Sequence, residues 1–171
     1  DDAALRAELR QRITAAADAA RALGGYQLHF ATKLVGELPL PATLTLAWPE
    51  LPLGIRGTSA ERAELLRASL PSETESTVVP YPHLAVVRTT QLRASVFEEG
   101  GETLSTPHFD VTYWVSPEGE ERVAVFAFTS PMVDLQAELL ELFDAIISTV
   151  TLRSGRADEH RRRESAAAET A

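Results

Sequence analysis

The sequence predicts an α+β fold in which an antiparallel sheet of about six strands carries helices on both faces, with a further helix at the N-terminus. Segments with the alternating apolar and polar period of strands follow one another with short turns between them. That order favours antiparallel neighbours over a doubly wound parallel sheet. The segment 122–129 is apolar on both faces, and such a strand is usually buried on both. Helices are therefore expected to cover each side of the sheet.

Length and composition exclude several classes of function. With 171 residues, of which 44% are hydrophobic, the chain is large enough for one domain with its own core and too short for two. The net charge is −9, and residues 153–171 hold five Arg against four acidic residues, so residues 1–152 carry about −10. An acidic body argues against nucleic acid or an anionic membrane as the main partner. Cysteine is absent, which removes disulfides, thiolate nucleophiles and cysteine-ligated metals.

Residues 1–25 are expected to form an N-terminal helix. Apolar residues recur along one face, acidic residues stand near its start, and a Gly-Gly pair ends it. The apolar positions are Leu5, Leu9, Ile13, Ala16, Ala20 and Leu23. Because two of the six are alanine and the stripe is thin in large side chains, the helix is either peripheral to the sheet or a docking helix for another chain.

Two strands are predicted next, at 26–35 and 42–48, because apolar and polar residues alternate in both. Prolines interrupt the pattern between them, and the two strands are expected to pair as a hairpin. An irregular loop follows at 49–57. Thr58 and Glu61 then have the spacing of a capping box, which predicts a short helix.

The middle of the chain is expected to alternate between strands and turns. In order, the segments are a strand at 74–79, a turn at 80–82, a strand at 84–90 that extends as far as Phe97 in one interpretation, and an acidic loop at 98–102.

The C-terminal part is predicted to contain two strands, at 107–115 and 122–129, joined by a turn at 116–119. Ser130 as a cap and Pro131 in the first turn predict that a long helix starts directly afterwards. Its apolar stripe consists of Leu135, Leu139, Leu142 and Ile146. Residues 153–171 have no apolar stripe and are expected to form a disordered or frayed tail.

The sequence contains no strong catalytic motif. There is no Gly-rich phosphate loop, no H-E-x-x-H and no G-x-S-x-G. His108 and Asp110 stand two residues apart, so their side chains can share a face and offer two ligands to a metal. Two ligands without a third are a poor metal site, and a solvated hydrogen-bonded pair is the favoured interpretation. We therefore expect a protein that is not an enzyme, and we assign no catalytic residue, metal ligand or cofactor.

The aromatic residues offer candidates for partner binding. Trp48 and Tyr81, with the neighbouring His83, are placed in proline-rich connections, where exposed aromatics are common in binding sites. The same residues could instead close an edge of the core, and both interpretations stay open. Trp114 falls on the polar face of its strand and is expected to be covered by a helix rather than exposed.

The closing strand and helix resemble those of PsbP-like domains. The resemblance lies in Val123-Ala124-Val125-Phe126-Ala127-Phe128-Thr129-Ser130-Pro131 followed by Leu142-Phe143-Asp144-Ala145-Ile146-Ile147-Ser148-Thr149. PsbP-like domains occur in photosystem extrinsic proteins, Ran-binding Mog proteins and actinobacterial LpqN-type lipoproteins. The resemblance implies a PsbP-like domain over residues 26–152, with an antiparallel sheet between helices. It implies a binding or assembly module and transfers no catalytic or ligand residue.

Together these observations predict a non-catalytic binding or accessory module that acts by contact with another protein. The single Lys against 15 Arg and the abundant alanine are typical of high-GC bacterial coding, so the source is expected to be a high-GC bacterium. The alternatives are a small-molecule carrier with a pocket between sheet and helix, lined by Tyr26, Phe30, Tyr113 and Phe126, and a hydrolase-like or metal-dependent enzyme that uses His108 and Asp110. No membrane span is expected, because no apolar run approaches the roughly 20 residues that one needs. The compartment stays open, with a slight preference for the cytoplasm, because the chain starts at Asp1 rather than Met and an upstream signal or lipid anchor could precede it.

Overall fold

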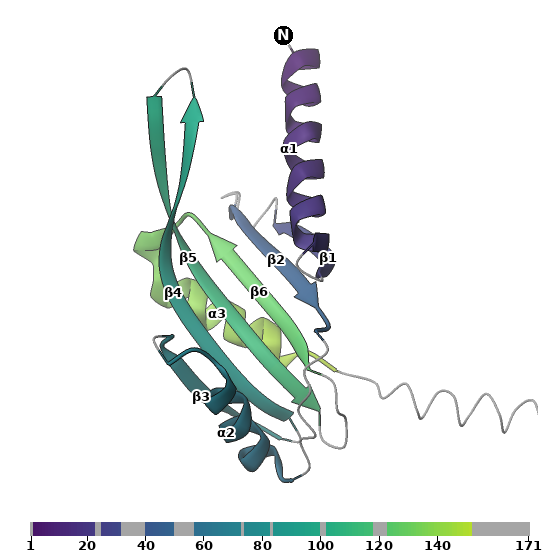
Figure 1. The fold of residues 1–171 in the computed structure, drawn as a ribbon, viewed down its shortest axis with the longest axis vertical. Coiled ribbons are helices and arrows are strands. Elements are labelled where there is room, and N and C mark those ends of the chain that lie inside the picture. Colours follow the sequence, from purple (N-terminus) through teal and green to yellow (C-terminus); the bar gives the residue numbers. More distant parts are fainter. Residues whose placement is uncertain are drawn as a thin grey trace, which may run out of the picture.

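The computed structural model describes residues 2–22, 25–31, 40–49, 57–72, 74–82, 84–99, 102–117 and 123–151. In these residues a six-stranded antiparallel sheet lies between helices on its two faces, which confirms the predicted α+β fold (Figure 1). The expected tail at 153–171 lies outside the described residues. Within them, no helix combines the length and the apolar character needed to cross a bilayer.

The elements follow the predicted order, and the strands pair as a meander with one added hairpin. The helices are α1 (Asp2–Ala22), α2 (Ser59–Ser69) and α3 (Gln136–Ser148), with a 3₁₀ turn η1 (Val133–Leu135) before α3. The strands are β1 (Gly25–Ala31), β2 (Ala42–Ala47), β3 (Ser76–Tyr81), β4 (Leu84–Glu99), β5 (Glu102–Pro117) and β6 (Ala124–Ser130). The spatial order is β1-β2-β6-β5-β4-β3, so the β1–β2 hairpin joins the meander through β6.

The larger core lies between the sheet and α3. Alternate residues of the central strands, such as Val111, Tyr113 and Phe128, point to this side and are almost completely buried. From the helix they meet Phe143 and Ile147, and the rings of Phe128 and Phe143 stack with their centres 4.3 Å apart. This contact fixes α3 against the middle of the sheet (Figure 1).

A second core lies between the opposite face of the sheet and α2. Its buried members are Ala63 and Leu66 of α2, Ala85 and Val87 of β4, Val125 of β6, and Val123 just before β6. The alternating side chains of β6 thus enter both cores, as expected for a strand that is apolar on both faces. Thr58 and Glu61 form the predicted capping box, because each accepts a hydrogen bond from the backbone N–H of the other.

The start of α3 and its buried face differ from the prediction. Ser130 ends β6 instead of capping the helix, and its hydroxyl accepts the N–H of Met132 in the turn that precedes η1. The buried positions of α3 are Leu139, Phe143 and Ile147, whereas Ile146 is 38% exposed. The predicted stripe was wrong at both ends, because Leu135 lies in η1 and is as exposed as Ile146; Leu139 is buried as predicted, and Leu142 packs against the core while only partly buried.

β4 and β5 are longer than predicted, and β3 lies two residues further along the chain than predicted. β3 continues through Pro80 to Tyr81, although the sequence predicts a turn there; an edge strand tolerates proline where the missing N–H would face solvent. β4 runs to Glu99 and β5 begins at Glu102, with Glu99 and Glu102 directly paired. The predicted acidic loop at 98–102 was therefore wrong in its bounds, because most of it belongs to two paired strands.

Candidate functional site

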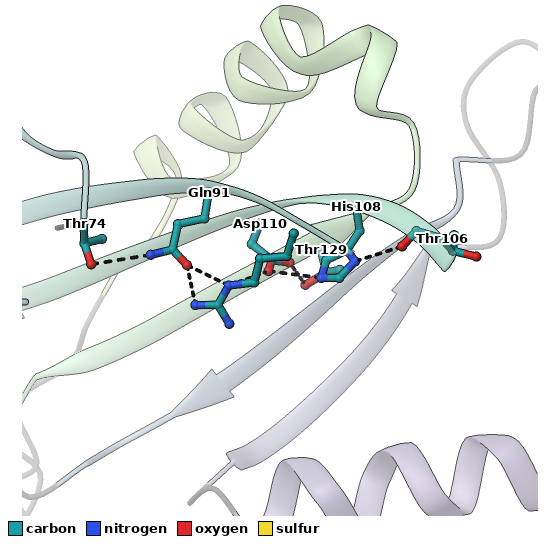
Figure 2. Close-up of polar contacts among 7 residues, drawn as sticks. Thr74, Gln91, Thr106, His108, Asp110 and Thr129 are labelled. Atoms are coloured by element: carbon teal, nitrogen blue, oxygen red, sulfur yellow. Dashed lines mark hydrogen bonds and ion pairs between the residues drawn. The ribbon is translucent and has the colours of Figure 1, made fainter. Parts of the chain in front are cut away.

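A row of polar side chains lies on the same face of the sheet as α2, in a part of that face that α2 does not cover. It consists of Thr74, Gln91, Arg93, Thr106, His108, Asp110 and Thr129, which come from β4, β5 and β6 and, for Thr74, from the segment that leads into β3 (Figure 2). Register brings the side chains together, because Arg93 is paired with His108 and Asp110 stands between Gln91 and Thr129 on neighbouring strands. The strands thus assemble residues that are far apart in the sequence.

Asp110 is the centre of the polar row. Thr129 Oγ1 donates a hydrogen bond of 2.7 Å to one carboxylate oxygen. The other oxygen lies 3.4 Å from His108 Nε2 and 3.8 Å from Arg93 Nε. The side chains of His108 and Asp110 are 16% and 21% exposed, whereas that of Arg93 is 62% exposed. Arg93 also donates to Gln91 Oε1 at 2.7 Å, so its guanidinium is held along the strand.

This arrangement does not form a recognisable catalytic unit in the described part of the chain. The hydroxyl of Thr129 donates to the carboxylate of Asp110 and not to the imidazole of His108, and among the described residues no hydroxyl is hydrogen-bonded to that imidazole. The described residues also contain no group of three His, Cys, Asp or Glu side chains that could hold a metal ion. The geometry supports a hydrogen-bonded network on an open sheet face.

The outer halves of β4 and β5 form an arm that leaves the rest of the sheet. We define the arm as residues 92–99 and 102–108, where β4 and β5 pair with each other and, among the described residues, with no other strand. Pairing of β4 with β3 ends at Thr89, and pairing of β5 with β6 ends at Phe109. The arm therefore projects beyond the two packed layers (Figure 1).

On its face toward the α3 side, the arm carries apolar side chains next to the sheet that no described residue covers. Alternation along the strands places Leu92, Ala94, Val96 and Pro107 on this face, in line with the buried core residue Phe109. Leu92 is 61% exposed and Val96 is 66% exposed, whereas Phe109 is only 4% exposed. The apolar surface of the core thus continues into solvent along the arm.

A polar cluster that the sequence did not reveal joins α3 to the sheet around Asp144. Arg88 Nη1 lies 2.5 Å from one oxygen of its carboxylate, and the hydroxyl of Tyr113 donates to the other at 2.7 Å. The hydroxyl of Tyr81 donates to the backbone carbonyl of Asp144 at 3.1 Å. Burial and then the nearby carboxylate raise the pKa of Tyr113 well above its usual range, and the same two causes raise the pKa of Tyr81.

The predicted partner-binding residues do not form one surface in the described structure. Trp48 follows β2 and is 39% exposed, whereas Tyr81 is half-buried against α3 at the end of β3. Three strands, β6, β5 and β4, separate β2 from β3. His83 lies outside the described residues. Trp114 is half-buried and packs against the α2 core, as expected for a residue that a helix covers.

A small apolar hollow lies between the β1–β2 hairpin and α3. Its volume is about 210 Å³. It is lined by His29, Leu40, Ala42, Thr43, Leu44, Phe128, Leu142, Phe143 and Ile146. Of the lining expected from the sequence, Tyr113 and Phe126 lie in the core beside the hollow, and the side chains of Tyr26 and Phe30 are outside the described set.

Neither the arm nor the Asp144 cluster was identified from the sequence. The signal for the arm was present, because Leu92, Ala94 and Val96 alternate with polar residues as a strand does. Asp144 carried no signal, since one acidic residue in a helix is ordinarily solvated. The chain matches no family model, no curated protein and no solved structure, so its function has to be argued from this geometry.

Proposed function

We propose that the chain is a non-catalytic binding or accessory module that acts by protein–protein contact, with the arm as its contact surface. The observation that carries this proposal is the exposure of Leu92 and Val96 on a projecting face that continues the core. Burying a side chain of this size stabilises a complex by about 1.5–3 kcal/mol before the costs of association. Apolar surface that is continuous in this way is typical of an interaction site.

Two further points support the arm over the other candidates. The polar row lacks a nucleophile at His108 within the described residues, so an enzymatic function has less to support it. Tyr81 is occupied in a contact with α3, which favours a structural role over partner binding for that residue. The resemblance of β6 and α3 to the closing elements of PsbP-like domains, which mostly serve as binding or assembly modules, points in the same direction.

The test compares two exposed leucines in a cross-linking experiment with extract of the native host. Leu92→Ser alters the apolar face of the arm, and Leu65→Ser alters the exposed side of α2, where the leucine is 49% exposed. We expect Leu92→Ser to lose a cross-linked partner that the wild type and Leu65→Ser both retain. Equal capture by both variants, at unchanged thermal stability, would contradict the arm as the contact surface.

The hollow beside α3 favours a second candidate function, a carrier of a small apolar ligand. Its lining is almost entirely apolar, although about 210 Å³ is below the usual range of ligand pockets. Ile146→Trp should fill the hollow from a position that is 38% exposed and so tolerates the change. If the protein is a carrier, a ligand detected by native mass spectrometry in the wild type should disappear in this variant. A protein that shows no bound ligand in either form would rule this function out.

A further inference from the structure

Among the described residues, no strand pairs with the outer edge of β4 in the arm, so this edge presents a row of backbone donors and acceptors. The N–H of Thr90 donates to the carbonyl of Glu75, on the side of β4 where β3 lies. Consecutive residues of a strand direct their backbone groups alternately to its two sides, so every second residue after Thr90 points the same way. These residues are Leu92, Ala94, Val96 and Glu98, and they lie beyond Thr89, which is paired with the first residue of β3. An edge of this kind is a ready template for another strand.

The opposite edge of the arm is blocked. Pro107 is paired with Ala94, whose own backbone groups point to the β4 edge, so the nitrogen of Pro107 faces the outer edge of β5. Proline has no N–H to donate, and its presence is a common means of protecting an edge strand. The arm is therefore open to strand pairing along β4 and closed along β5.

The charges along the β4 edge are complementary to those of the same edge in a second, antiparallel copy of the chain. An antiparallel pairing centred on Val96 sets Arg93 opposite Glu99 of a second copy, and symmetry repeats this pair. Arg93 and Glu99 point their backbone groups away from the shared edge, and the Cα atoms of residues opposed at such positions are closest. Glu98 stands opposite Ala94, so no two carboxylates face each other directly. The pairing extends from 93 to 99 and ends before Thr90, where β3 begins to occupy the edge.

We infer that the β4 edge of the arm pairs with the β4 edge of a second copy of this chain, in antiparallel register about Val96. The inference rests on the proposed function and specifies how its contact surface is built. The two-fold axis that relates the two copies is perpendicular to the plane of the joined sheet. The apolar faces of both arms therefore lie on the same side of that sheet. Leu92 and Val96 of the two copies then form one surface, which is larger than either arm offers alone.

The decisive experiment uses charge reversal, with the dissociation constant of the dimer measured by sedimentation equilibrium on the full chain. Arg93→Glu and Glu99→Arg each place two pairs of like charges across the interface. We expect each variant alone to dissociate about tenfold more readily than the wild type, or more. An equimolar mixture of the two restores both attractive pairs, and it should form a heterodimer as tight as the wild type. Failure of the mixture to recover would overturn the register.

A matched pair of proline variants tests the edge itself. Val96→Pro removes an N–H that points to the free β4 edge, so the hydrogen bonds between β4 and β5 remain. Ser105→Pro changes the residue directly paired with Val96 and removes an N–H from the blocked β5 edge. We expect Val96→Pro to abolish the dimer and Ser105→Pro to leave it intact. Equal effects of the two prolines would overturn the assignment of the β4 edge.

The outcomes separate this inference from the proposed function. A wild-type chain that stays monomeric at all concentrations overturns self-pairing, and the cross-linking result with Leu92→Ser then still decides the proposed function. A dimer that Val96→Pro abolishes supports self-pairing even if no host protein is captured.

Discussion

Removing the carboxylate of Asp144 should loosen the attachment of α3 to the sheet. The Asp144→Ala change deletes the acceptor of both Arg88 and Tyr113, at 2.5 and 2.7 Å. A hydrogen bond to a charged group contributes about 1.5–3 kcal/mol, and a buried hydroxyl left without an acceptor costs about 1–3 kcal/mol. Because Asp144 is 32% exposed, water can replace part of what is lost. We expect unfolding to become easier by about 2–4 kcal/mol in total.

Chemical denaturation by urea, followed by circular dichroism, measures this loss as a change in the free energy of unfolding. Glu141→Ala is the matched control, because Glu141 is an exposed acid on the same helix, and it should change stability by less than about 0.5 kcal/mol. In a double-mutant cycle, Tyr113→Phe should show a coupling with Asp144→Ala of about 0.5–3 kcal/mol. Additive effects of the two changes, or an Asp144→Ala protein as stable as the control, would refute the cluster as an anchor.

Three further predictions concern the helices and the response to pH. Phe143→Ala should lower the free energy of unfolding by about 3–5 kcal/mol, because the ring is 1% exposed and stacked on Phe128 of the sheet. Ile146→Ala should lower it by less than about 1 kcal/mol. Similar shifts in melting temperature for the two variants would contradict the assigned buried face of α3. The raised pKa of Tyr113 means that the folded state favours its neutral hydroxyl. Its contribution is therefore complete below the unfolded pKa of about 10 and is lost as the pH rises above it, so Tyr113→Phe should flatten the alkaline fall in urea midpoint. Thr58→Ala should cost about 1 kcal/mol, and since capping lowers the pKa of Glu61 below 4.5, the wild-type advantage should fade as the pH falls below that value.

The fold could be predicted because its signals are local and repeated. Alternation along 122–129 indicated a strand buried on both faces, and β6 indeed contributes to both cores. Thr58 and Glu61 predicted α2, because the capping box is a hydrogen-bond pattern that needs only four consecutive residues. The predicted start of α3 was wrong because Ser130 and Pro131 suit the end of a strand as well as they suit the start of a helix. Which of the two forms depends on the pairing of Ser130 with Phe109, a partner that is distant in sequence.

The arm, where we propose the contact surface, likewise depends on pairing between residues that are distant in sequence. Three glutamates and two glycines in 98–102 favour a solvated loop on local grounds, and nothing in those residues indicates a partner strand. Whether they continue a ladder depends on how far β4 and β5 match each other in register, from Leu84 opposite Pro117 to Glu99 opposite Glu102. Once that register is known, it follows which of the two edges of the strand the backbone N–H of each residue faces. The proposed self-pairing about Val96 therefore follows from the register and could not be reached from the alternation alone.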